Sequence, residues 1–402
     1  MSINLMKVSM TMSKEITVFT MISPSYESSS EFILCLKMFR EALPSDAHLV
    51  MTGETHQSSL RTLIADHIPG IVTPYVLIVK EPALIMEKGT IEAMLDIMTL
   101  NQHTQCVLPS DIRGFRSGRV AAYSTLRGFE RFVASLFDQE RKVMPYDNRE
   151  PWMFLIRSEV LSQMEIPEDP FCIPRSLPES QTCIALNAYV HPFIDYYEEK
   201  RSDVLPLIPG GIATLLDIGC SRGNFGAAVR KELGCRVVGV EINAHEAQKA
   251  RSKLDLVIEG NILTADITER FDCVTCLDVL EHVEHTEIFL NKIRSLLNKD
   301  GYLLLSIPNI GHWNIVEDLI AGRWDYVPAG ILCITHLRFF TKRTIESLLR
   351  DAGFSIITIK ENNTSLPGNA SGWLNLLEQS GLDVNRKSLS CLGYYIVAQK
   401  IV

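Results

Sequence analysis

Histidines and carboxylates gather in two stretches of the second half of the chain, and side chains of these types can move protons. One stretch contains Asp278, Glu281 and His282, and the other contains His312 and His336. Imidazole titrates near neutral pH, so a histidine is the usual general base for a hydroxyl. His336 and His282 are therefore the predicted catalytic residues, followed by His312, although each also fits a structural role.

The same side chains permit a second interpretation, a site for a divalent cation. Asp278, Glu281 and His282 are spaced i, i+3 and i+4, so a helical turn would place them on one face. With His336 they offer two carboxylates and two imidazoles, which suit an octahedral ion with open positions. The first interpretation, which we keep, includes no metal and leaves Asp278 to face a cofactor.

A strand, a glycine-rich turn and a helix follow one another from Thr214 onward, an order that begins a nucleotide-binding α/β unit. Gly219 and Gly223 let the backbone pass close to a ligand above the strand ends. The next expected strand ends at Glu241, 241 − 219 = 22 residues after Gly219, close to the ~20 at which a Rossmann-type unit places an acid on the ribose. A carboxylate there can accept hydrogen bonds from both ribose hydroxyls.

The turn follows Asp217 and lacks the Gly-x-Gly-x-x-Gly order that places a diphosphate on a helix N-terminus. Its pattern, Gly-Cys-Ser-Arg-Gly, resembles the first motif of class I S-adenosylmethionine-dependent methyltransferases. Later motifs of that family are resembled, in the right order, by residues 257–262, 271–278, 279–283 and 301–309. The resemblance implies a Rossmann-like α/β fold with a seven-stranded sheet over 191–402, and S-adenosylmethionine as the cofactor.

The resemblance also assigns the cofactor contacts. The glycine turn would lie along the amino-acid end of the cofactor, Glu241 would bind the ribose, and Asn261, in place of the more common Asp, would lie near the adenine. Tyr197 and Arg201 would cover the methionine end, where an arginine can pair with the carboxylate. The predicted cofactor-binding residues are Asp217, Gly219, Cys220, Gly223, Glu241, Ile242, Asn261, Ile262, Leu277, Asp278, Tyr197 and Arg201.

A long excursion, residues 309–341, separates the fifth expected strand from the next helix and is rich in His, Trp, Arg and Tyr. Such side chains suit a polar, ring-shaped acceptor. The excursion resembles a segment of methyltransferases encoded with polysaccharide glycosyltransferases, which implies O-methylation of a saccharide or glycan-linked acceptor. The alternatives are a quinone or other small aromatic hydroxyl, a bifunctional glycosyltransferase–methyltransferase, and a non-catalytic scaffold.

Residues 1–170 alternate strands and helices of their own, which predicts a separate α/β domain. This part resembles the nucleotide-sugar-binding domain of family 2 glycosyltransferases in three segments, 22–26, 73–83 and 152–157. Where that family holds a metal with two acids, this chain has Glu81 and Ala83, and one carboxylate is a poor divalent site. We therefore expect a degenerate glycosyltransferase A-like domain without glycosyl transfer, a proline-rich linker at 171–190, and the methyltransferase domain at 191–402.

The composition limits the class of protein. The 402 residues include 39 basic and 48 acidic side chains, and the net charge of −9 argues against general nucleic-acid binding. No run approaches the ~18 apolar residues of a transmembrane helix, and the first residues lack the apolar core of a signal peptide.

Ten scattered cysteines, with no second pair of ligands to join Cys273 and Cys276, indicate free thiols in a reducing compartment. We expect a cytoplasmic enzyme, in which an apolar helix within 362–390 covers the core or forms a homo-oligomer contact.

Overall fold

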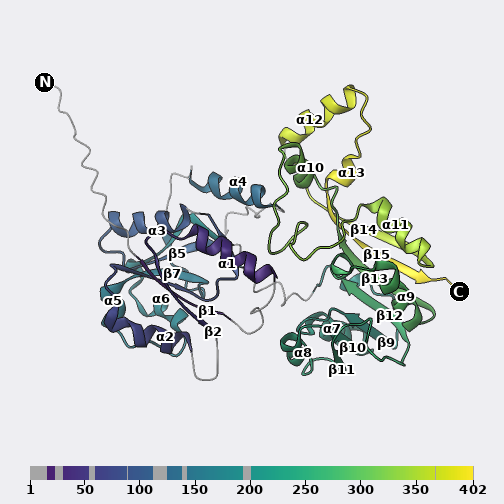
Figure 1. Ribbon diagram of the computed structural model, residues 1–402, viewed down its shortest axis with the longest axis horizontal. Coiled ribbons are helices and arrows are strands. Elements are labelled where there is room, and N and C mark those ends of the chain that lie inside the picture. Colours follow the sequence, from purple (N-terminus) through teal and green to yellow (C-terminus); the bar gives the residue numbers. More distant parts are fainter. Residues whose placement is uncertain are drawn as a thin grey trace. The chain divides into compact units, whose positions relative to one another are not determined.

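A computed structural model describes residues 16–22, 30–53, 59–87, 89–111, 125–137, 143–192, 201–366 and 368–401. The chain divides into two compact units, each with its own sheet (Figure 1). The N-terminal unit is Met1–Ala121 with Glu130–Pro192, and the C-terminal unit is Ala122–Phe129 with Phe193–Val402.

The N-terminal unit contains a mixed β-sheet in the order β2-β1-β3-β7-β5-β8-β4, with β6 paired to β8. β1, β2 and β3 are parallel, and β7 lies antiparallel between β3 and β5. The inner strands are almost wholly buried, which is why they are mostly apolar in the sequence. The elements are β1 Ile16–Ile22, α1 Ser30–Ala42, β2 His48–Gly53, α2 Leu60–His67, η1 Ile68–Gly70, β3 Tyr75–Val79, β4 Leu84–Met86, α3 Gly89–Leu100, β5 Cys106–Asp111, β6 Val143–Pro145, β7 Met153–Arg157, α5 Ser158–Ser162, η2 Pro170–Cys172, α6 Ile173–Ser176, η3 Glu179–Gln181 and β8 Thr182–Pro192, where η denotes a 3-10 helix; α4, Leu126–Phe137, begins in the C-terminal unit.

The segment 171–190, expected as a linker, is instead part of the N-terminal unit. Pro170 and Pro174 lie in the first turns of η2 and α6, where a missing N–H group costs little. The chain then enters β8, which pairs in parallel with β5 and is largely buried. The boundary between the units therefore follows Pro192. Pro170 and Pro174 therefore mark the starts of helices, a position where proline is common, as it is in linkers.

The C-terminal unit contains a seven-stranded sheet in the order β11-β10-β9-β12-β13-β15-β14. Of these strands only β15 runs against the others, antiparallel to both β13 and β14. The Rossmann-like, seven-stranded sheet expected for this half is confirmed. The elements are η5 Leu205–Leu207, β9 Thr214–Ile218, α7 Asn224–Leu233, β10 Arg236–Glu241, α8 Ala244–Ala250, β11 Leu256–Glu259, β12 Phe271–Leu277, η6 Leu280–His282, α9 Thr286–Leu296, β13 Leu297–Pro308, α10 Trp313–Ile320, α11 Lys342–Asp351, β14 Phe354–Asn363, α12 Gly368–Gln379, α13 Arg386–Leu389 and β15 Cys391–Lys400.

The parallel strands of this sheet bring the chemically interesting turns together. β9, β10, β12 and β13 end at Ile218, Glu241, Leu277 and Pro308. Because the carboxyl ends of parallel strands meet at one edge, the glycine turn, Glu241, η6 and the excursion after β13 all start from that edge.

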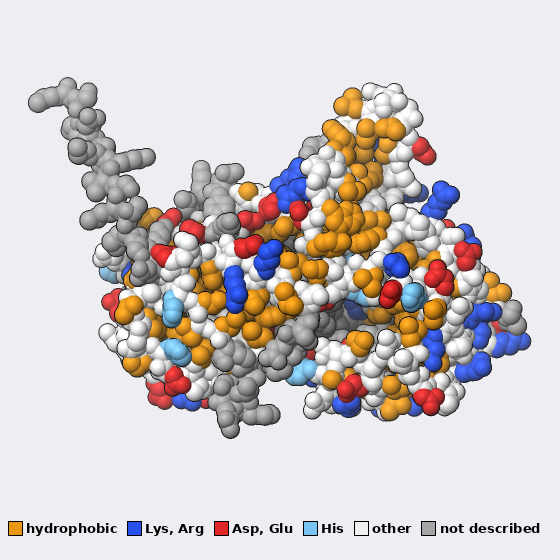
Figure 2. Space-filling model, viewed as in Figure 1, with side chains coloured by type: hydrophobic (Ala, Val, Ile, Leu, Met, Phe, Trp, Pro, Cys, Tyr) orange, Lys and Arg blue, Asp and Glu red, His pale blue; other side chains and the backbone are white. Residues whose placement is uncertain are grey.

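Helices α10 and α12 form a small apolar cluster of their own in the C-terminal unit. Trp313 of α10 packs against Ala370 and Leu374 of α12. Large side chains of these helices that remain exposed are Leu319, Ile320, Trp373 and Leu376. Figure 2 shows hydrophobic surface over this part of the unit. The homo-oligomer contact predicted for this region stays a prediction.

Among the described residues, no helix is both long and apolar enough to cross a membrane.

Asn309 links the end of β13 to the segment before β15. Its buried side-chain amide donates to the carbonyls of Ser388 (2.8 Å) and Cys391 (2.7 Å) and accepts from the Gly311 N–H (3.0 Å). We expect Asn309→Ala to lower the free energy of unfolding by about 2–4 kcal/mol, because three hydrogen bonds of this buried amide are lost. Urea denaturation measures this loss, and Asn291→Ala on the exposed face of α9 is the matched control, with an expected change below about 0.5 kcal/mol. Equal losses in the two variants would contradict the role of Asn309.

Candidate active site

The backbone N–H groups of the glycine turn are directed at β10. Gly219 and Cys220 both donate to the Val240 carbonyl, at 2.8 and 3.1 Å, and Ser221 donates to Oε2 of Glu241 at 2.8 Å. A diphosphate needs free N–H groups at such a turn, and these three are already engaged. The turn therefore fits a cofactor that has no phosphate at this point.

Glycine is required in the turn by conformation and by space. Gly219 has φ +73°, and a Cβ atom on it would lie 2.5 Å from Cγ2 of Val279. Gly223 has the same φ and precedes α7. The Cys220 side chain between them is buried, and burial raises the pKa of its thiol, so Cys220 packs in the turn as a neutral thiol.

Glu241 is a largely buried carboxylate that ties the turn to the start of α8. Besides the Ser221 bond, its Oε1 accepts from the Asn243 N–H at 2.8 Å. Burial raises the pKa of Glu241, and the two N–H groups oppose this by stabilising the charged form. Each oxygen keeps a lone pair beyond the one it uses, so the carboxylate retains capacity for ribose hydroxyls.

The residues expected near the adenine differ in exposure. Ile242 is 72% exposed directly after Glu241 and offers an apolar surface at the strand end. Ile262 is buried in the core of the unit. Asn261 is exposed, and its Oδ1 accepts from the Leu263 N–H at 2.9 Å, so the side chain orders its own turn.

Asp217 lies inside the core at the end of β9. Its Oδ1 accepts a hydrogen bond from the Thr275 hydroxyl of β12 at 2.7 Å. Burial, opposed by this hydrogen bond, raises the pKa of Asp217 to about 7. The side chain thus supports the turn from the strand that precedes it, and a direct contact with the cofactor stays a prediction.

Arg201 and Asp278 form an ion pair beside a cavity of about 470 Å³. Nη1 of Arg201 lies 2.5 Å from Oδ2 of Asp278, and the Ser306 hydroxyl donates to Oδ1 at 2.7 Å. Leu277 ends β12 just before Asp278, whereas Tyr197 lies outside the described residues. The cavity is lined by Arg201, Asp203, Asp278, Glu281, Ser306, Ile307, Pro308, Gly330, Ile331, His336, Asn362, Leu392, Gly393, Tyr394 and Tyr395.

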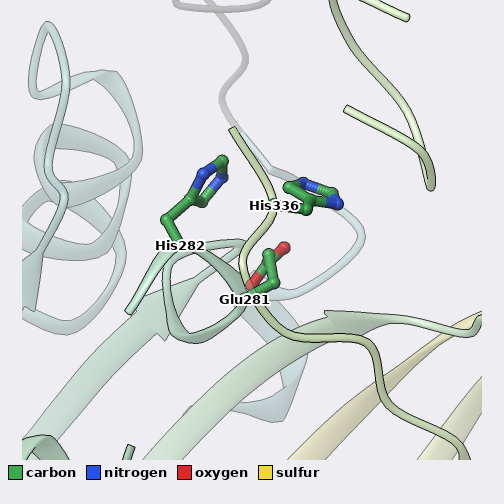
Figure 3. Close-up of side chains that lie close together, drawn as sticks. All are labelled: Glu281, His282 and His336. Atoms are coloured by element: carbon green, nitrogen blue, oxygen red, sulfur yellow. The ribbon is translucent and has the colours of Figure 1, made fainter. Parts of the chain in front are cut away.

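Glu281, His282 and His336 lie together at the same edge, and one ligand atom of each lies within 4.8 Å of the other two (Figure 3). The two imidazole rings meet edge to face with centroids 4.7 Å apart. Backbone hydrogen bonds hold the group, because the N–H groups of Leu337 and Arg338 both donate to the Glu281 carbonyl, at 2.8 and 3.0 Å. This pairing brings His336 to η6 across 54 residues of sequence, since 336 − 282 = 54.

Both histidines direct Nδ1 at a backbone carbonyl. Nδ1 of His336 lies 2.9 Å from the Ile331 carbonyl, and Nδ1 of His282 lies 3.2 Å from the Thr335 carbonyl. A carbonyl only accepts, so each Nδ1 carries the proton and each Nε2 is an acceptor in the neutral ring. Burial and the neighbouring His282 lower the pKa of His336 to about 4, so it is neutral at pH 7.

Glu281 is the most unusual group of the cluster. It is 1% exposed, and within the described residues neither carboxyl oxygen has a hydrogen-bond partner. Burial, and then the charge of Asp278, raise the pKa of Glu281 well above its ordinary value. A buried carboxyl without partners is costly, so its oxygens are suited to a ligand.

Comparisons with known proteins identify the domain. Residues 189–359 match a family model described as a methyltransferase domain. A ubiquinone biosynthesis O-methyltransferase of Cereibacter sphaeroides is 29% identical over 208 residues, which cover 48% of this chain and 81% of that protein. A mitochondrial protein of the same name from Schizosaccharomyces pombe is 35% identical over 101 residues, 23% of this chain and 36% of that protein. A solved SAM-dependent methyltransferase of Archaeoglobus fulgidus is 20% identical, covers 52% of this chain and 98% of its own, and has a TM-score of 0.39.

The C-terminal unit is an S-adenosylmethionine-dependent methyltransferase domain. The turn whose N–H groups are engaged by β10 agrees with this cofactor, which carries no phosphate.

His312, the third predicted catalytic residue, has a structural place in the methyltransferase domain. Its Nδ1 accepts from the Asn314 N–H at 3.3 Å as the N-cap of α10, and Nε2 lies 3.2 Å from the Thr364 hydroxyl. Both ring nitrogens are thus engaged, and His312 is not among the cavity-lining residues. The structure brings His282 and His336 together and leaves His312 outside their cluster.

The donor set of the cluster fits a divalent cation. Two neutral imidazole nitrogens and one carboxyl group are ordinary ligands for such an ion. Asp278, the fourth ligand of the metal interpretation, does not belong to the cluster and instead binds Arg201 and Ser306. Three residues of the methyltransferase domain can therefore hold a metal.

Several supporting residues were missed in the sequence. Ser306 and Thr275 orient Asp278 and Asp217 through hydroxyl groups that no sequence motif marks. Arg222 and Glu246 form a buried pair behind the glycine turn. In the sequence, the only indication of the latter pair is that Arg222 lies inside the turn and that the acidic Glu246 follows β10 in the chain.

Proposed function

We propose that this protein is an O-methyltransferase whose acceptor is a small aromatic hydroxyl, including a quinone-type ring in its reduced form. The observation that carries the proposal is the cluster of Glu281, His282 and His336 at the same strand edge as the glycine turn. The relatives named ubiquinone biosynthesis O-methyltransferase favour the aromatic alternative over the saccharide acceptor.

Aromatic side chains beside the cluster support a flat acceptor. The ring centroids of His336 and Phe339 lie 6.4 Å apart. Phe339 in turn meets Trp324 edge to face, with ring centroids 5.4 Å apart. Such rings accept an aromatic acceptor by stacking or by edge contacts. A saccharide ring would also stack here, so the acceptor panel below contains both classes.

The residues of this chain would bind the two ends of the cofactor separately. S-adenosylmethionine supplies a methyl group on a positively charged sulfur. Glu241 takes the ribose hydroxyls, with Ile242 and Asn261 on the adenine side. The Arg201–Asp278 pair offers a cation for the carboxylate of the amino-acid end and an anion for its ammonium group.

The cluster would remove the proton from the acceptor. A neutral imidazole accepts the hydroxyl proton on Nε2, either at His336 or at His282. The oxygen would then be the nucleophile for the methyl group that S-adenosylmethionine, held by Glu241 and Arg201, would supply. The Nδ1 bonds to Ile331 and Thr335 keep each ring in the tautomer that can accept this proton.

A divalent cation on Glu281, His282 and His336 is a second way to use the same cluster. Such an ion would lower the pKa of a bound hydroxyl as a Lewis acid. The partnerless Glu281 carboxyl is the observation that favours it. Elemental analysis of the purified protein, and of Glu281→Gln, tests this use without any activity measurement.

The N-terminal unit is proposed to be a degenerate glycosyltransferase A-like domain that binds a glycan, binds a partner or has a purely structural role. The sequence segments behind this resemblance lie in or next to β1, β3 and β7, which are adjacent in the sheet. Glu81 and Ala83 follow β3, and because Ala83 carries no carboxylate, this pair of positions offers no two-carboxylate metal site.

The deciding experiment measures methyl transfer from labelled S-adenosylmethionine to a panel of catechols, hydroquinones and saccharides. We expect product with aromatic hydroxyls and only background with the saccharides. Product with saccharides alone would restore the first acceptor prediction. Cofactor binding without transfer to any member would contradict the aromatic proposal.

A further inference from the structure

A largely buried ion pair joins the glycine turn to α8. Nε of Arg222, in the turn, lies 2.6 Å from Oε2 of Glu246 in α8, and Lys249 approaches Oε1 at 3.3 Å. The side chain of Glu246 is 1% exposed and that of Arg222 is 12% exposed. A carboxylate buried to this degree needs a charged partner, because its desolvation is otherwise uncompensated.

The Glu246 carboxylate can bind Arg222 because of the hydrogen bonds that Asn243 makes between β10 and α8. Asn243 caps α8, and its Oδ1 accepts from the N–H groups of His245 and Glu246. The third residue of a helix often returns its carboxylate to the N–H of the cap residue. Here the Asn243 N–H already donates to Glu241, so the Glu246 carboxylate is available to Arg222.

Arg222 directly follows Ser221, the residue whose backbone N–H connects the turn to Glu241. Ser221 has φ +48°, a left-handed conformation that a residue other than glycine adopts only when its surroundings hold it. Its N–H donates to Oε2 of Glu241 at 2.8 Å. Glu246 and Glu241 therefore hold two successive residues of the turn, one through a side chain and one through the backbone.

We propose that Arg222 and Glu246 are positioning residues for the cofactor, which keep the Ser221 N–H on Glu241 and so aim the Glu241 carboxylate at the ribose. The pair itself would make no contact with the cofactor. This inference rests on the proposed binding of the ribose by Glu241.

The test compares S-adenosylhomocysteine with its 2′-deoxy analogue by calorimetric titration into the full chain. The wild type should prefer the ribose form by about tenfold, since one hydrogen bond to a charged group is lost in the analogue. In Arg222→Met, which keeps the apolar stem of the side chain, we expect S-adenosylhomocysteine to bind about tenfold more weakly. Its preference over the deoxy analogue should fall to about twofold or less. Glu246→Gln should behave in the same way.

Two further variants separate positioning from general damage. Arg222→Lys keeps a cation for Glu246 and should recover most of the affinity and the ribose preference. Arg230→Met removes an arginine of α7 that pairs with Asp255 at 2.9 Å on a half-exposed surface, and should leave both ligands unchanged.

The possible outcomes are distinct. Equal weakening of both ligands in Arg222→Met, or no weakening of either, overturns the positioning role. If the wild type binds neither ligand, the proposed cofactor site is wrong, and the positioning role that depends on it is overturned with it. Loss of the ribose preference in Arg222→Met, with recovery in Arg222→Lys, supports the inference.

Discussion

Replacing His336 by alanine is expected to lower kcat by about 10²–10⁴-fold while the dissociation constant of S-adenosylmethionine stays within about twofold. The lone pair of Nε2 is lost from the cluster, but the residues proposed to bind the cofactor, Glu241 and Arg201, are unchanged. His282→Ala should produce a loss of the same order, because its Nε2 is also an acceptor. Steady-state transfer to the best aromatic acceptor at saturating cofactor measures kcat, and titration of the cofactor measures binding.

His285→Gln is the matched control, since His285 is exposed and follows η6 by three residues (285 − 282 = 3). It should retain the wild-type rate. Full activity in both His336→Ala and His282→Ala would contradict proton removal by the cluster. If Glu281→Gln loses as much activity as the histidine variants and a chelator inactivates the wild type, the cation use of the cluster is favoured over a direct imidazole base.

The proposed cofactor half of the site rests on signals that are local in the sequence. Gly219, Gly223 and Glu241 lie within one strand–turn–helix–strand unit, and the backbone conformations that they require follow from their residue types. The same locality made the strands recognisable, since a buried parallel strand is an unbroken apolar run. These features need no knowledge of which distant segments meet.

The acceptor half depends on contacts that the sequence does not express. His336 reaches His282 through contacts across the fold: the N–H groups of Leu337 and Arg338 bind the Glu281 carbonyl, and the His282 ring bonds the Thr335 carbonyl. His312 has the same residue type and lies in the same excursion, yet it caps α10 instead. Asp278 has the spacing of a metal ligand, but its left-handed backbone, φ +54°, turns it toward Arg201 and Ser306. Residue type and spacing could not separate these three outcomes.

Glu241→Ala is expected to weaken S-adenosylmethionine binding by at least about 100-fold. The loss of a charge-assisted hydrogen bond costs about 1.5–3 kcal/mol, and two ribose hydroxyls are involved. The structure adds a second cause, because the N–H groups of Ser221 and Asn243 lose their shared acceptor and the glycine turn loses its anchor.

Glu241→Gln separates the two causes. A glutamine keeps one acceptor oxygen for either N–H group and places an NH₂ group against the other, so the turn stays partly anchored while the charge is removed. We expect its affinity to lie between those of the wild type and Glu241→Ala, as measured by calorimetric titration. Glu269→Ala removes an acid that pairs with Arg236 at the opposite end of β10 and should bind the cofactor as the wild type does. Wild-type affinity in Glu241→Ala would show that the ribose is held elsewhere, and the proposed orientation of the cofactor along the strand ends would then be wrong.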